Sequence, residues 1–106
     1  MKYMNKISLY LIATLLSTQV LATDYEVAQK NKEFSKKKLI VNVGDTVKFS
    51  NDDYFFHNVF SISEVKTFDL GSYPEGESKS VTFDKPGIVE VECAIHPNMK
   101  MVIEVK

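Results

Sequence analysis

The chain has 106 residues, with 13 lysines against 14 acidic residues, one cysteine, two histidines and no arginine. Its length allows one small domain. Its near-neutral charge and its lack of arginine argue against nucleic-acid binding, because bidentate contacts to phosphates and guanines depend on arginine.

The first 22 residues are typical of a secretory signal peptide. Lys2 and Lys6 give a positive start, residues 7–16 form an apolar stretch, and cleavage is predicted after Ala22. The apolar run is short and is interrupted by serine and threonine, which disfavours a membrane span; a retained N-terminal anchor is the alternative. The remaining domain, residues 23–106, would carry a net charge of −3 and lie in the periplasm.

After residue 22, apolar and polar residues alternate in short runs that are separated by turn residues. This period of two is typical of strands, and their number and spacing predict an all-β sandwich or barrel. No helical pattern of useful length competes. The predicted strands cover residues 39–43, 46–50, 80–83, 89–93 and 101–105, with a further strand-like segment around His57.

Residues 93–100 place a thiol, an imidazole and a thioether in one short loop. Cys93, His96 and Met99 follow one another at intervals of three residues, and His57 supplies a second imidazole. Two imidazoles, a thiolate and a weak thioether are the ligands of copper electron-transfer sites. The sequence therefore predicts one copper ion bound by His57, Cys93 and His96, with Met99 as the axial ligand. Met101 is the rival for the axial position, although it would need a wider loop.

Each of these residues also has an ordinary structural explanation. Cys93 cannot form an intramolecular disulfide, because it is the only cysteine, and it could simply be a buried apolar residue. His57 could pack among the neighbouring aromatic residues, His96 could lie on a surface loop, and Met99 could fill the core. Their joint occurrence at this spacing favours the metal site.

The alternation of residues also predicts where the ligands point. Glu90 and Glu92 should face solvent, so Cys93 should emerge on the core side of its strand. Met99 and His57 each share the parity of inward-facing apolar neighbours. We therefore expect the four side chains to converge at one end of the sandwich, unless a bulge changes the parity.

The Cys93-x-x-His96-Pro97-x-Met99 loop, together with His57-Asn58-Val59, resembles the cupredoxins, which are small type 1 blue copper proteins. Within that family it is most similar to amicyanin and more distantly to pseudoazurin and plastocyanin. The resemblance continues through residues 40–51 and 86–93. It implies a Greek-key β-sandwich of about eight strands. It also implies His57, Cys93 and His96 as equatorial copper ligands and Met99 as the axial ligand.

Two further residues are expected to support the copper site. The resemblance favours Asn58 as a brace, whose side chain would tie its strand to the Cys93 loop and whose backbone amide would donate to the cysteine sulfur. Pro97 would stiffen the loop, because it lacks an N–H and has a fixed φ. Asn98 departs from the aromatic residue expected at this place in amicyanin.

These features predict an exported electron carrier that is not an enzyme, because four protein ligands leave no open position for a substrate. Redox-partner proteins are expected to dock near His96, the more exposed imidazole, and the mature chain should be a monomer without a membrane span. A periplasmic copper carrier without an electron-transfer role is the alternative; a zinc module is disfavoured, because a thioether suits zinc poorly. Five acidic residues could form a steering patch or be solvated loop charges: Asp52, Asp53, Glu64, Glu75 and Glu77.

Overall fold

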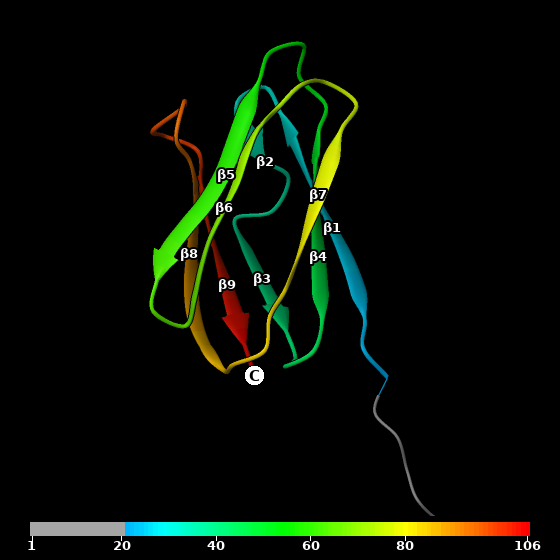
Figure 1. Cartoon of the computed structure of the whole chain (residues 1–106), viewed down its shortest axis with the longest axis vertical. Helices are drawn as coiled ribbons and strands as arrows, with labels where there is room; N and C mark the ends of the chain where they lie inside the picture. Colours follow the sequence, from blue (N-terminus) through cyan, green and yellow to red (C-terminus); the bar gives the residue numbers. More distant parts are fainter. Residues whose placement is uncertain (1–20) are drawn as a thin grey trace, which may run out of the picture.

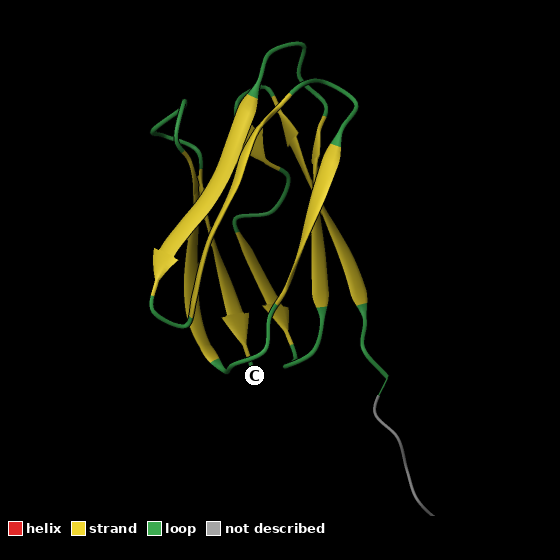
Figure 2. Ribbon diagram, in the orientation of Figure 1, coloured by secondary structure: helices red, strands yellow, loops and turns green. Residues whose placement is uncertain are grey.

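The computed structural model describes residues 21–106, and all of its regular elements are strands (Figure 2). The predicted signal peptide, residues 1–22, lies almost wholly outside the described residues. Between residues 21 and 106 there is no helix of the length and apolarity that crossing a membrane requires.

Within residues 21–106, nine strands form two sheets that pack face to face as a sandwich (Figure 1). The four-stranded sheet has the order β2-β1-β4-β7, with β1 (Asp24–Lys30), β2 (Glu33–Phe34), β4 (Thr46–Asn51) and β7 (Ser78–Thr82). The five-stranded sheet has the order β3-β9-β8-β5-β6, with β3 (Lys38–Val41), β9 (Lys100–Val105), β8 (Gly87–Cys93), β5 (His57–Ser63) and β6 (Lys66–Tyr73). Among these described strands, the pairs β1–β4 and β3–β9 are parallel and the other pairs are antiparallel.

The predicted all-β sandwich is confirmed, and the five predicted strands correspond to β3, β4, β7, β8 and β9. Their inward-facing residues form one core between the sheets, as the alternation required. Strand β3 ends at Val41, two residues earlier than predicted, and Val43 is 47% exposed in the turn that follows. The short strand β2 brings the number of strands to nine rather than about eight. The fully buried members of the core include Val27, Val47, Phe49, Val59, Phe83, Val89, Val91 and Ile103.

A row of phenylalanine rings joins the two sheets through the core. Phe49 of β4 contacts Phe34 at 6.3 Å and Phe68 at 6.4 Å between ring centroids, and Phe68 in turn contacts Phe83 at 6.3 Å. Each such aromatic pair adds about 0.5–1.5 kcal/mol beyond the area that it buries. The rings therefore tie the four-stranded sheet to β6 of the other sheet.

A bulge interrupts the pairing of β5 with β6 without changing the direction of side chains on β5. Asn58 pairs with Ser72 and Phe60 pairs with Asp69, so the extra residue belongs to β6, where Gly71 has a φ of 73°. Along β5, His57, Val59 and Ser61 remain buried in strict alternation. Because the bulge lies on β6 and not on β5, it does not turn His57 away from the core.

Gly87, at the start of β8, is a position where any side chain should be costly. Its φ is 140°, and a Cβ atom there would lie 2.5 Å from Cγ2 of Val65. We expect Gly87→Ala to lower the free energy of unfolding by about 1–3 kcal/mol through backbone strain and overpacking. Denaturant titration of the metal-free protein measures this.

Gly44→Ala is the matched control for that substitution, because Gly44 also has a positive φ, 99°, but a Cβ there would meet no atom within 4 Å. It isolates the strain from the contact with Val65. If Gly87→Ala proved no more destabilising than Gly44→Ala, the close approach to Val65 would be of no consequence.

Candidate metal centre

The thiol of Cys93 lies inside the sandwich at the end of β8. Cys93 pairs with Val59 of β5, and its side chain is 2% exposed. The backbone N–H of Asn58 donates a hydrogen bond to its sulfur, with 3.3 Å between N and Sγ. This hydrogen bond fixes the position of the sulfur relative to β5.

The imidazole of His57 is completely buried at the start of β5. Its Nδ1 atom lies 3.7 Å from Sγ of Cys93, and its Nε2 atom lies 2.9 Å from a carboxylate oxygen of Asp53. An ionised carboxylate only accepts hydrogen bonds, so Nε2 is the donor of this bond, and in a neutral ring Nδ1 then keeps its lone pair. The free nitrogen therefore faces the sulfur.

The loop of residues 94–99 brings the second imidazole to the same place. Three backbone hydrogen bonds close this loop: Met99 N–H to His96 O at 2.9 Å, Cys93 N–H to Met99 O at 3.3 Å, and Ala94 N–H to Asn58 O at 2.9 Å. They place Nδ1 of His96 3.6 Å from Sγ of Cys93. The His96 ring is only partly buried, and it contacts the ring of Phe55 at 5.2 Å between centroids.

The surroundings of His96 favour its neutral form. Burial is the main cause that lowers the pKa of His96, and the nearby His57 and Lys32 lower it further. A neutral imidazole has the free nitrogen that a metal needs. The residues around His96 therefore suit a ligand.

The three donor atoms form one compact group. Nδ1 of His57, Sγ of Cys93 and Nδ1 of His96 all lie within 4.8 Å of one another. Separations of 3.6 and 3.7 Å between sulfur and nitrogen suit a metal ion with bonds of about 2.0–2.3 Å to each. One thiolate and two imidazoles are also the donors that copper prefers over magnesium or calcium. The residues present therefore fit a copper ion.

Met99 and Met101, the two candidates for the axial ligand, are both buried, at 1% and 2% exposure. The backbone of Met99 belongs to the closed loop, because its N–H and its carbonyl oxygen bond to His96 and Cys93. Met101 is already part of β9, where it pairs with Val91. The backbone of Met99 is therefore bonded to two of the three donor residues, whereas Met101 lies two residues further along the chain.

The supporting residues differ in part from those expected. The Asn58 backbone amide reaches the sulfur, but the Asn58 side chain donates to Asp69 of β6 at 2.9 Å rather than to the Cys93 loop. The backbone carbonyl oxygen of Asn58 connects β5 to that loop instead, because it accepts a hydrogen bond from the N–H of Ala94. Pro97 is exposed at the tip of the loop.

Two supporting residues were missed by the sequence reasoning. Asn51 is fully buried at the end of β4; its amide donates to the carbonyl oxygens of Phe55 and Tyr73, and its side-chain oxygen accepts from the Asp53 N–H. Asp53 is 4% exposed, so it is neither a steering charge nor a solvated one. Asp53 lies four residues before His57, and this spacing was the signal for their contact that the sequence offered.

Comparisons with known proteins agree with this geometry. The family model described as copper binding proteins of the plastocyanin/azurin family matches residues 21–106. The chain belongs to that family. The resemblance to cupredoxins, and to amicyanin among them, is confirmed, and copper is the metal that this family binds.

Three relatives illustrate the range of the family. The methylamine utilization protein MauL of Methylorubrum extorquens is 29% identical over 102 residues, which cover 93% of this chain and 88% of MauL. An oxidised amicyanin with a proline-to-alanine substitution is 26% identical, with a TM-score of 0.73 over 78% of this chain and 82% of amicyanin. A copper-containing nitrite reductase from Thermus scotoductus is 31% identical, with a TM-score of 0.72 over 85% of this chain. This chain spans only 23% of that reductase.

Proposed function

We propose that the chain is an exported electron carrier whose single copper ion is held by His57, Cys93 and His96, with Met99 as the axial ligand. The observation that carries this proposal is the meeting of one sulfur and two nitrogen donors within 4.8 Å of one another. A bound copper ion would supply a centre that gains and loses one electron. The side chains keep that centre in one place and exclude water from one side of it.

The way the ligands are held suits electron transfer. Electron transfer is slow when ligands must rearrange, because the two oxidation states of copper prefer different surroundings. Cys93 and His57 lie on paired strands, and backbone hydrogen bonds fix the loop that carries His96. These constraints resist rearrangement between the two states.

The surface around His96, called the docking pole below, is proposed as the place where electrons enter and leave the protein. His96 is the partly exposed imidazole, whereas His57 is fully buried. A hollow of about 350 Å³ beside His96 is lined by Lys32, Ile95, Pro97 and Asn98. Small apolar contacts of this kind suit the short-lived complexes of redox proteins.

Export to the periplasm and the absence of enzymatic activity are also part of the proposal. A signal peptide over residues 1–22 supports export. The four proposed ligands close the site against substrate, and the activity of the nitrite reductase belongs to a protein of which this chain spans less than a quarter. A copper carrier would differ by releasing copper readily to a chelator instead of cycling between oxidation states.

Replacing Cys93 tests the proposal directly. With copper(II) added, the protein should show an intense visible absorption band from thiolate-to-copper charge transfer and should undergo reversible one-electron reduction. Cys93→Ser removes the thiolate and should abolish the band. A wild-type protein that binds copper without this band, or loses it to a mild chelator within the time of mixing, would contradict the electron-carrier function.

The axial ligand is tested by comparing two similar substitutions. We expect Met99→Leu to alter the visible spectrum and raise the reduction potential, because an axial thioether favours the oxidised ion. Met101→Leu preserves size and burial and should change stability by less than about 1.5 kcal/mol while leaving both properties as in wild type. The opposite result would identify Met101 as the axial ligand.

The docking pole is tested by electron self-exchange between oxidised and reduced copies of the protein, measured by NMR line broadening. Ile95 is 48% exposed beside His96, so Ile95→Lys places a charge where two copies must meet and should slow self-exchange about tenfold or more. Ile62→Lys is the control, because Ile62 is 76% exposed at the far end of β5. Equal rates in the two variants would place the electron path elsewhere.

A further inference from the structure

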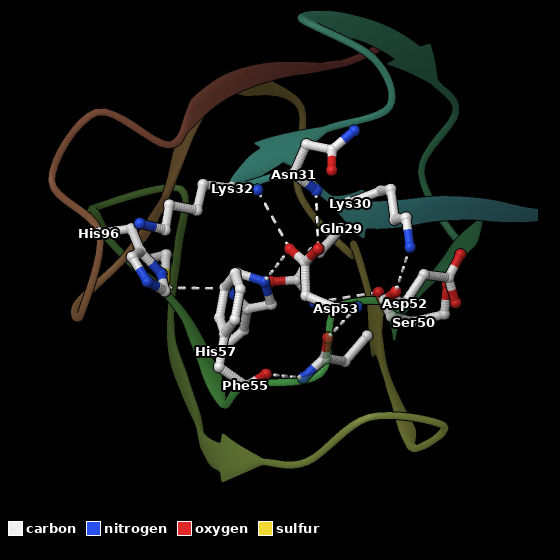
Figure 3. A network of polar contacts seen from close by, with 12 residues as sticks. Gln29, Lys30, Asn31, Lys32, Ser50, Asp52, Asp53, Phe55, His57 and His96 are labelled. Carbon is white, nitrogen blue, oxygen red and sulfur yellow. Dashed lines mark hydrogen bonds and ion pairs between the residues drawn. The ribbon is translucent and has the colours of Figure 1, made fainter.

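A buried carboxylate links the candidate ligand His57 to the turn between β1 and β2. Asp53 accepts three hydrogen bonds: from the N–H of Asn31 at 2.7 Å, from the N–H of Lys32 at 3.0 Å, and from Nε2 of His57 at 2.9 Å (Figure 3). One of its oxygens serves Lys32 and His57 together, and the other serves Asn31. All three donors converge on a side chain that is 4% exposed.

We propose that Asp53 is a positioning residue for the metal centre, which fixes the proton and the ring orientation of His57 through this carboxylate. The inference rests on the proposed function in that His57 is taken as a copper ligand. With the proton held on Nε2, the lone pair on Nδ1 is directed toward Sγ of Cys93, 3.7 Å away. The other tautomer would put a proton where the metal must bind.

The position of Asp53 is itself fixed from two sides. Asn51 receives the Asp53 N–H at 2.8 Å, and the two turn amides hold the carboxylate. The carboxyl group that faces His57 is thus held in a single orientation by its hydrogen bonds.

The turn that supplies the two amides has an unfavourable backbone. Asn31 and Lys32 have φ values of 55° and 60°, a left-handed region that asparagine tolerates and lysine rarely adopts. A glycine at the second position would be the usual choice for such a two-residue hairpin turn. The carboxylate of Asp53 stabilises this conformation, because it accepts hydrogen bonds from both successive N–H groups.

The turn also carries a charge to the docking pole. The Lys32 ammonium lies 5.6 Å from the centre of the Phe55 ring, and Phe55 in turn contacts the His96 ring. Lys32 lines the hollow beside His96. Asp53 therefore orients one imidazole directly and places a cation near the other through the turn.

A buried carboxylate at the opposite end of the sandwich provides a matched control. Asp45 is 2% exposed, and its two oxygens accept the backbone N–H groups of Thr23 and Asn42, each at 2.8 Å. Asp45 precedes strand β4, whereas Asp53 follows that strand. Asp45 therefore anchors backbone segments as Asp53 does, but it contacts no histidine among its hydrogen-bond partners.

The experiment compares Asp53→Asn with Asp45→Asn. In either variant an NH₂ group replaces one oxygen, so one amide of the backbone loses its acceptor. Copper(II) affinity, measured by competition with a chelator, should fall about 10- to 100-fold in Asp53→Asn and stay within about twofold of wild type in Asp45→Asn. Equal losses in the two variants, or wild-type affinity in Asp53→Asn, would overturn the positioning role.

A second measurement uses the metal-free wild-type protein and needs no variant to fold. Nitrogen-15 NMR of the His57 ring should show the proton on Nε2 at neutral pH. A proton on Nδ1 would overturn the inference. This result does not depend on the visible band that tests the proposed function, so the failure of one can be told from the failure of the other.

Discussion

The metal centre depends on two hydrogen bonds that join Asn58 of β5 to Cys93 and Ala94 at the end of β8. Asn58 donates its N–H to the sulfur of Cys93 and accepts the N–H of Ala94 on its carbonyl oxygen. Because Asn58 directly follows His57 in the chain, the sulfur is held at a fixed place relative to the first imidazole. Hydrogen bonds in a buried site are strong and are costly to leave unmade. The separation of these two donors is therefore set by the backbone.

The two imidazoles differ in ways that suit different tasks. His57 is fully buried, and its outer nitrogen is held by a carboxylate, so it can anchor an ion without contacting solvent. His96 sits on a loop closed by backbone hydrogen bonds and is partly exposed beside apolar residues. Their rings lie 4.9 Å apart between centroids. A centre between them would be in contact with the rigid interior on one side and close to an approaching protein on the other.

The sequence predicted the parts of this arrangement that follow from local patterns. Alternation along β8 correctly predicted that Cys93 faces inward, and the spacing of the loop predicted that His96 would lie close to it. Strands β1 and β6 were not identified, because Gln29 occupies a buried position on β1 and a bulge at Gly71 breaks the alternation on β6. Asp53 was read as a surface charge, since its burial depends on turn amides that lie more than twenty residues earlier. Such contacts have no periodic signature.

The buried carboxylate has an electrostatic consequence for a redox centre. Burying a charge is costly unless a partner compensates it, and the partners of Asp53 are two amides and one imidazole N–H, none of which carries a full positive charge when His57 is neutral. A bound metal ion would face this carboxylate together with the thiolate that Cys93 forms as a ligand, and hence two negative charges. A doubly charged cation neutralises both, whereas a singly charged one leaves an excess. The charge of Asp53 therefore favours the oxidised state of a copper centre, and the apolar surroundings, which favour the smaller charge, act against it.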